Sequence, residues 1–482
     1  MADDTVSRTL HSVARGAGVM FIGTMVSKAI MYFYRLVVAR WLGPADYGLL
    51  SLALSVFWLS VTISHMGVPA GVERYVSDYI GREDEEGIKG MVYAGLGITL
   101  PWSLIVAAGV FLSAGTISRL AFHEPSLAIY LKAFALGIPF QILYKNMEKV
   151  VQAFREFRYE VYVDRLFRSL ATLGVTLALF YLGFGLMGAV LAQLVSIVLS
   201  SLLILYFLES RVRSLFRSST SPEFEPRKLV SFSWPLFLSG VIGTFVGKVD
   251  TFMLGYFDAA RTVGIYNAAL PTAQLLMVVG GTFSTALFPN VSQLYGRERK
   301  EDAIRLASTA LKWMFSIVFP ALLLMVLFAR PGLRLLFGHE YVGAAVALSI
   351  LGTAYFLNVM MNYAGSFIKA EDRTRLTALN TGAVSVLNIG LNYLLIPIYG
   401  LSGAALATAS AMAFGGFLAA FEVYYLFGVQ PFELRRFAAP FLASVLSAGG
   451  VYAVTERLFR VTPVWVLVPA FFAFLLLYAV LF

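Results

Sequence analysis

The sequence predicts an all-α integral membrane protein with fourteen transmembrane helices, arranged as two six-helix lobes related by pseudo-two-fold symmetry plus two extra C-terminal helices. Composition, the length of the apolar runs and an internal repeat lead to this fold class. Of 482 residues, 59% are hydrophobic and only 13% are charged, whereas a soluble domain carries roughly 25% charged residues. A cytosolic enzyme or a secreted domain is therefore not expected. The absence of cysteine from the sequence excludes disulfides, thiolate metal sites and cysteine nucleophiles.

The apolar runs each last about 20 residues, which is enough to cross a bilayer as a helix. Charged or turn residues separate them, as at Gly43-Pro44, where the first run ends. In chain order the predicted spans are 16–40, 46–71, 89–114, 125–150, 160–182, 186–208, 230–256, 263–292, 304–328, 341–367, 377–396, 401–426, 437–454 and 462–481.

The basic residues indicate how these spans are oriented. If the N-terminus and every second loop lie on one side, most of the 37 lysines and arginines fall on that side. The positive-inside rule then places both termini in the cytoplasm of a multi-pass cell-membrane protein. We therefore interpret the net charge of +9 as an orientation signal, and we do not expect a nucleic acid partner.

The sequence contains a repeat. Residues 22–28 (IGTMVSK) reappear as residues 242–248 (IGTFVGK), and Gly81-Arg82-Glu83 reappears as Gly296-Arg297-Glu298 at a similar offset. Two copies with six helices each have the same orientation, so an axis along the membrane normal should relate them, with a cavity between the lobes as in a rocker-type transporter. The predicted organisation is an N-terminal lobe at 1–208, a cytoplasmic linker at 209–229, a C-terminal lobe at 230–426 and two additional helices at 427–482.

Cations inside the spans are candidates for the functional site, because a charge at mid-bilayer costs about 2.5–3.5 kcal/mol and normally faces protein or water. Helical spacing places Thr24, Lys28, Tyr32 and Arg35 in one stripe of the first span. The repeat supplies Thr244 and Lys248 in the seventh span. One interpretation is a cationic cavity for an anionic substrate, and the alternative is that each lysine snorkels or pairs within its own lobe.

Two further polar groups have open interpretations. Asp250 follows Lys248 by two residues, about 200° around a straight helix, where it could bind a proton or Na⁺ or merely cap a polar group. Asn358 and Asn362 lie one turn apart and suit sugar hydroxyls, although interhelical hydrogen bonding explains them equally well.

We predict neither a catalytic residue nor a metal site. Acids in the predicted outer loops form no close pair of the kind that a glycosyltransferase needs. His123 and His339, each beside one glutamate, offer too few ligands for a metal. The chain is therefore expected to be a transporter and not an enzyme.

Two segments carry a resemblance to a known family. They are residues 35–48 (RLVVARWLGPADYG) and 248–255 (KVDTFMLG), the latter followed by Val263-Gly264-Ile265-Tyr266. With the repeat, they resemble the multidrug/oligosaccharidyl-lipid/polysaccharide (MOP) flippase superfamily, and within it the polysaccharide-lipid flippases. The resemblance implies export of an isoprenoid-linked oligosaccharide from the cytoplasmic to the outer leaflet, for polysaccharide or glycan biosynthesis. It further implies that basic residues hold the phosphate or pyrophosphate, as Lys28, Arg35 and Lys248 would.

The alternative within the superfamily is a cation-coupled multidrug antiporter, which relies on acids embedded in the membrane, and Asp250 keeps that alternative open. We expect a monomer whose partners are the lipid-linked oligosaccharide and membrane lipids, with glycan-assembly enzymes as further candidates. No cofactor is expected; coupling to a Na⁺ gradient, an H⁺ gradient or the membrane potential remains open.

Overall fold

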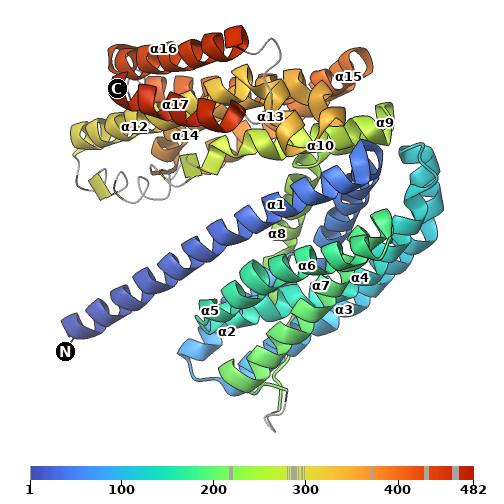
Figure 1. Cartoon of the computed structure of the whole chain (residues 1–482). Coiled ribbons are helices and arrows are strands. Elements are labelled where there is room, and N and C mark those ends of the chain that lie inside the picture. Colours follow the sequence, from blue (N-terminus) through green and yellow to red (C-terminus); the bar gives the residue numbers. More distant parts are fainter. Residues whose placement is uncertain are drawn as a thin grey trace. The chain divides into compact units, whose positions relative to one another are not determined.

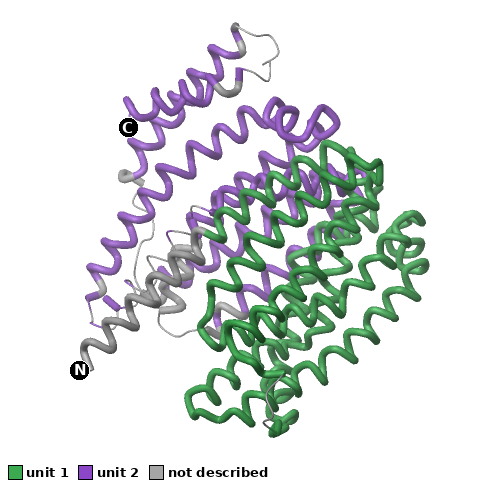
Figure 2. Tube along the Cα trace, turned by 60° about the horizontal axis from the view of Figure 1, so that its bottom comes forward, with its two compact units in different colours: residues 1–260 green, residues 261–482 purple. Residues whose placement is uncertain are grey.

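The structure is a computed structural model that describes residues 2–481 except 217–220, 279, 282, 284–289, 291–292, 295–296, 298, 371–373, 428–433 and 459–465. Side chains at 2–22, 300, 362–370, 374–375, 377–378, 426–427, 434–436, 456, 458 and 467–468 are also outside the described set. The described part forms two compact units, residues 1–260 and 261–482 (Figure 2). Within the described ranges the elements are helices and no strand occurs, as expected for an all-α membrane protein.

Figure 1 shows the elements of both units. The first unit contains α1 (Ala2–His65), α2 (Val68–Gly81), α3 (Glu85–Thr116), η1 (Ile117–Ala121), α4 (Leu127–Ala153), α5 (Phe157–Glu160), η2 (Val161–Phe167), α6 (Arg168–Tyr181), α7 (Gly185–Phe207), η3 (Leu208–Val212), α8 (Pro226–Val246) and α9 (Val249–Phe257). The second contains α10 (Ala260–Gln274, whose first residue still belongs to the first unit), α12 (Lys300–Leu327), α13 (Ala329–Leu336), η4 (His339–Ala344), α14 (Ala345–Ala370), α15 (Thr374–Phe427), α16 (Leu434–Leu458) and α17 (Leu467–Leu481).

Two glycines divide the longest helices. Gly43 in α1 has φ 75° and ψ 172°, and Gly400 in α15 has φ 53° and ψ −129°. These left-handed φ values are accessible to glycine at little cost, so each long element is two helices joined at a glycine. Both breaks agree with the predicted span ends. Ten helices in the described part of the chain are long and apolar enough to cross a membrane, so the count of fourteen stays a prediction.

The sequence reading was wrong about residues 66–81. We placed the end of a span at residue 71, but α1 ends at His65, and Met66 and Gly67 turn the chain with φ values of 49° and 71°. Helix α2 then follows, with Val68, Val72 and Val76 on its buried face. Apolar residues at every fourth position predict such an amphipathic helix, and the charged residues between them led us to read it as a loop.

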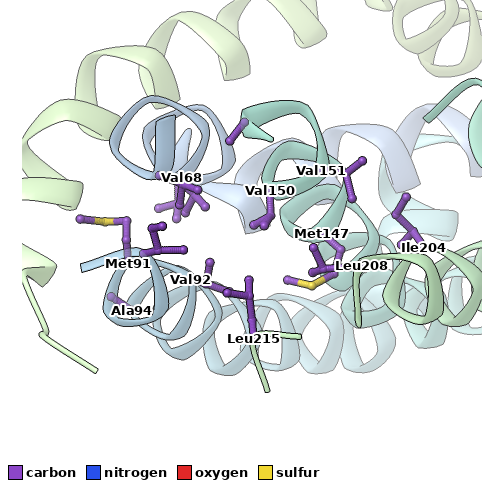
Figure 3. Close-up of a cluster of buried hydrophobic side chains, with 14 of the residues drawn as sticks. Val68, Met91, Val92, Ala94, Met147, Val150, Val151, Ile204, Leu208 and Leu215 are labelled. Carbon is purple, nitrogen blue, oxygen red and sulfur yellow. The ribbon is translucent and has the colours of Figure 1, made fainter. Parts of the chain in front are cut away.

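A buried apolar cluster holds the first unit together at one end (Figure 3). It joins Val68 of α2, Met91 of α3, Met147 of α4 and Leu208 of η3. Leu215, which belongs to the predicted linker, is only 5% exposed and packs into the same cluster. The start of the linker is therefore part of the core of this unit.

Candidate functional site

One face of α1 packs against the rest of the first unit. A Cβ on Gly23 would lie 2.5 Å from Cγ1 of Val161, so η2 approaches the α1 backbone closely there. One turn later the Ser27 hydroxyl bonds the Ser169 hydroxyl of α6 at 2.8 Å. Further along, Nε2 of Gln193 on α7 donates to the buried Tyr34 hydroxyl at 3.3 Å. These contacts fix the rotation of α1 about its own axis.

The predicted cationic stripe lies on another face of α1. Lys28 and Arg35 are both exposed, and Thr24 and Tyr32 beside them are half-buried. Each residue turns an α-helix by 100°, so this stripe lies roughly 100° around the helix axis from the packed face. Lys28 and Arg35 are about 10 Å apart along that axis. Neither cation has an acidic partner among the described residues. The stripe is therefore a cationic surface that its own unit does not neutralise.

Lys248 lies where the seventh predicted span breaks. Its backbone has φ −123° and ψ 2°, between the last residue of α8 and the first of α9. Its amide donates to the Phe245 carbonyl at 3.0 Å, which tightens the end of α8. The side chain is half-buried, and the ammonium lies within electrostatic range of Arg35. Two like charges held close together destabilise each other unless an anion lies near both.

The break between α8 and α9 changes the expected orientation of Asp250 relative to Lys248. The estimate of about 200° between Lys248 and Asp250 assumed a straight helix, but Lys248 lies outside helical geometry, so this angle does not apply. Asp250 is half-buried in the first turn of α9 and takes part in an interaction there. Its role in ion coupling stays a prediction.

Thr244 forms a contact between helices. Its hydroxyl lies 3.1 Å from the hydroxyl of Thr62 on α1, and Thr62 in turn donates to the Trp58 carbonyl at 3.0 Å. Because the Thr62 proton is engaged by the carbonyl, Thr244 donates in the pair. Thr244 therefore attaches the end of α8 to α1, a few residues before Lys248.

The predicted amides lie in the other compact unit. Asn358 is half-buried on α14 and takes part in an interaction, and the side chain of Asn362 lies outside the described residues. The structure places Lys248 within electrostatic range of Arg35, and Lys28 lies on the same face of α1 as Arg35. A sugar site formed by the two amides stays a prediction.

The sequence reading missed a buried polar network between α4 and η2. Glu160 is 2% exposed; it accepts from Gln152 at 2.7 Å and pairs with Arg165 at 3.4 Å. Arg168 donates to the fully buried Gln141 at 2.8 Å and pairs with Asp164 at 3.5 Å. Asp164 and Arg165 belong to η2, Glu160 is the last residue of α5 and Arg168 is the first of α6. No sequence signal predicts such a π-helical segment. Acids and bases are paired here, so the network is structural.

Within the described ranges, no group of three or more His, Asp or Glu side chains could hold a metal ion. The charged side chains that the structure places at the candidate site include the cations Lys28, Arg35 and Lys248. Lysine and arginine at the edge of helical segments can bind a phosphate by charge-assisted hydrogen bonds. Lys28, Arg35 and Lys248 are groups of this kind, and a role for them in holding a phosphate or pyrophosphate stays a prediction.

Comparison with known families gives two matches. The profile of the family described as polysaccharide biosynthesis protein matches residues 13–295, more than half of the chain, and the MatE profile matches residues 235–394. Both matches include α9 and the part of α8 that follows residue 234. The chain is also 25% identical to the probable low-salt glycan biosynthesis flippase Agl15 of Haloferax volcanii, over 91% of this chain and 86% of that protein. It is 23% identical to a putative O-antigen transporter of Shigella flexneri, over 77% of this chain and 88% of that protein.

Solved structures share the fold. The inward closed conformation of the lipid II flippase MurJ matches with a TM-score of 0.76 at 15% identity, covering 95% of this chain and 97% of that one. An inward-facing multidrug resistance transporter of the MATE family matches with a TM-score of 0.66 at 18% identity, covering 87% of this chain and 99% of that one. At these identities the likeness establishes the fold and says nothing of the substrate.

Proposed function

The chain belongs to the polysaccharide biosynthesis protein family of the MOP flippase superfamily, as the sequence motifs predicted, and on that premise we propose that it flips an isoprenoid-linked oligosaccharide. The substrate would carry a phosphate or pyrophosphate and would move from the cytoplasmic to the outer leaflet by alternating access. The relatives named as glycan flippases and O-antigen transporters support this substrate class.

The observation that carries the proposal is the proximity of Lys248 to Arg35. Two cations that no described acid neutralises form a favourable place for the linker of such a substrate, which carries one negative charge as a phosphate and two as a pyrophosphate. In this proposal Lys28, about two turns from Arg35, receives the anion at another stage of its passage. The polar residues Thr24 and Tyr32, with Asn358 and Asn362, contact the glycan, and no metal or cofactor takes part.

The organisation that we propose for transport has fourteen spans in two six-helix repeats with two additional C-terminal helices. Both termini would lie in the cytoplasm of a cell-membrane protein that works as a monomer, with glycan-assembly enzymes supplying its substrate. A Na⁺ gradient, an H⁺ gradient or the membrane potential would provide the energy, with Asp250 as the candidate coupling residue.

A transport assay in liposomes tests the proposal. Purified protein is reconstituted with a fluorescent isoprenoid-pyrophosphate oligosaccharide, and a membrane-impermeant reagent quenches the label in the outer leaflet. We expect the quenched fraction to rise with time beyond that of protein-free liposomes. Equal rates with and without the protein, for both phosphate- and pyrophosphate-linked substrates, would contradict it.

The second candidate is a cation-coupled multidrug antiporter. The MatE match over residues 235–394 favours it, because this segment contains Asp250. An antiporter should lower the accumulation of a cationic dye in cells that express the protein, and Asp250→Asn should abolish that effect. Dye accumulation that equals the vector control would remove this candidate.

A further inference from the structure

Two phenylalanines flank the break between α8 and α9 at Lys248. The Lys248 amide donates to the Phe245 carbonyl, and the Lys248 carbonyl accepts from the Phe252 amide, both at 3.0 Å. The rings of Phe245 and Phe252 stack on each other, with their centres 5.8 Å apart and their planes at 17°. The two residues that bond the backbone of Lys248 therefore also contact each other across the break.

This ring contact depends on the break. In a straight α-helix, residues seven apart are separated by about 10.5 Å along the axis, and their side chains lean in the same direction. The two rings would then keep a similar separation, beyond the range of about 4.5–7 Å in which aromatic pairs are found. At Lys248, φ is −123° and ψ is 2°, which interrupts the helix and lets the rings meet. The ring contact and the break therefore stabilise each other.

A third phenylalanine attaches this pair to the rest of the first unit. Phe122 is 5% exposed, and its ring stacks on that of Phe252 with the centres 6.4 Å apart. A Cβ on Gly255 of α9 would lie 2.9 Å from Cδ1 of Phe122 and 2.5 Å from Cδ2 of Leu52 on α1. Gly255 is three residues after Phe252 and on the same face of α9. This face is therefore packed tightly against Phe122 and α1.

The two residues after Phe122 also hold the chain near α9. His123 has φ 54°, which is uncommon for a residue with a Cβ, and its ring centre lies 5.9 Å from that of Tyr256 on α9. The Glu124 carboxylate accepts from the amide of Ala260, the first residue of α10, at 3.3 Å. Residues 122–124 thus fix α9 and the chain just beyond its end.

These contacts limit where the Lys248 ammonium can lie. The side chain starts at the residue between α8 and α9, so its direction changes if α9 rotates relative to α8. The ammonium lies within electrostatic range of Arg35, and like charges near each other repel. A flexible break would let the Lys248 side chain turn away from Arg35. A rigid break keeps both cations available to one anion.

We propose that Phe252 is a positioning residue for anion binding, because its ring holds the break rigid and keeps Lys248 beside Arg35. The inference rests on the proposed function, since the anion is the phosphate or pyrophosphate of the flipped substrate. Phe122 supports the ring of Phe252 from the other side of the contact between α9 and residues 122–124. In this role Phe252 acts through Lys248 and does not contact the substrate.

Substitutions that keep or remove the ring test this role in the liposome assay. Phe252→Leu should slow flipping roughly 3- to 10-fold, whereas Phe252→Tyr, which keeps the ring, should flip near the wild-type rate. In a Lys248→Gln background, Phe252→Leu should have no further effect, because the ammonium that the ring positions is gone. Phe257→Leu is the matched control, since the Phe257 ring on the same helix contacts that of Tyr256. Equal slowing by Phe252→Leu in both backgrounds, or no slowing in either, would overturn the proposal.

A second measurement does not depend on flipping. The sequence has no cysteine, so spin labels at Ile242→Cys and Ala259→Cys, both exposed and on opposite sides of the break, report its geometry. We expect one narrow distance distribution with Phe252 or Phe252→Tyr and a clearly broader one with Phe252→Leu. An equally narrow distribution with Phe252→Leu would overturn the proposal. Wild-type protein that moves no substrate would contradict the proposed function instead, and the label distances would still decide whether Phe252 holds the break.

Discussion

Lys248, at the break between α8 and α9, lies within electrostatic range of Arg35 on α1. Lys248 belongs to the second copy of the sequence repeat, and Arg35 belongs to the first copy. No described acid pairs with either of them. Like charges near each other destabilise each other unless an anion compensates them, and the phosphate-bearing substrate that we propose would supply that anion.

The stripe on α1 and the lysine at the break should matter for transport in a way that other cations in the spans do not. Lys28→Met and Lys248→Met each remove one charge-assisted hydrogen bond, worth about 1.5–3 kcal/mol, so flipping should slow roughly 10- to 100-fold. Lys132→Met is the matched control, because Lys132 lies exposed on α4 with its ammonium 5.4 Å from the ring centre of Phe111. A comparable loss in the Lys132 variant would show that any cation in a span is required.

The Glu225 carboxylate, which accepts from the Tyr79 hydroxyl and pairs with Lys228 at 2.9 Å, should make stability depend on pH. Hydrogen bonds from Tyr79 and then from Lys228 hold the pKa of Glu225 below its usual value, and Arg82 adds a smaller effect of the same sign. A carboxyl whose folded pKa is lowered stabilises the protein above its unfolded pKa of about 4.3, and this contribution is lost as the pH falls through the lowered folded value.

Glu225→Gln should therefore lower the midpoint of thermal unfolding by about 1–2 °C at pH 7, and this difference should shrink as the pH falls below about 4.3. Glu223→Gln is the control, since its carboxylate is exposed and makes no described side-chain contact. A deficit of the Glu225 variant that is as large at pH 3.5 as at pH 7 would contradict this account of the contact.

A glycine under the linker should tolerate no side chain. A Cβ on Gly90 would overlap the Glu223 carbonyl oxygen, so Gly90→Ala must displace the linker backbone. Overpacking of this kind costs about 1–3 kcal/mol, which thermal unfolding in detergent would detect. Gly97→Ala, on the same helix with nothing within 4 Å, should be neutral or slightly stabilising. Equal midpoints for the two variants would mean that the linker does not lie against α3.

Much of the fold could be predicted from the sequence, because apolar runs determine where helices form and glycines determine where the long helices break. The break at Gly43 and the break at Gly400 follow from the chemistry of those positions. The extent of α2 and the π-helical η2 were not predicted, because charged residues hide the amphipathic period of the first and tertiary packing imposes the second. The interruption of a predicted span at Lys248 was also not predicted, because tertiary packing imposes it as well.

The candidate site was predicted in its residue types and only partly in its geometry. The repeat identified Lys28 and Lys248, and helical spacing added Arg35. Spacing along one helix says nothing of which cation on another helix is near, so the proximity of Lys248 to Arg35 needed the structure. Thr244 matched the repeat as well, yet its hydroxyl contacts Thr62 and attaches α8 to α1.

The most direct test of the central claim compares flipping by four proteins in liposomes: the wild type, Arg35→Gln, Lys248→Gln and the double variant. The account predicts that each single variant slows flipping roughly 10- to 100-fold. The double variant should be slower than either, but by less than the product of the two factors, because one anion contacts both cations. Flipping at the wild-type rate by both single variants, at equal amounts of folded and inserted protein, would contradict the claim.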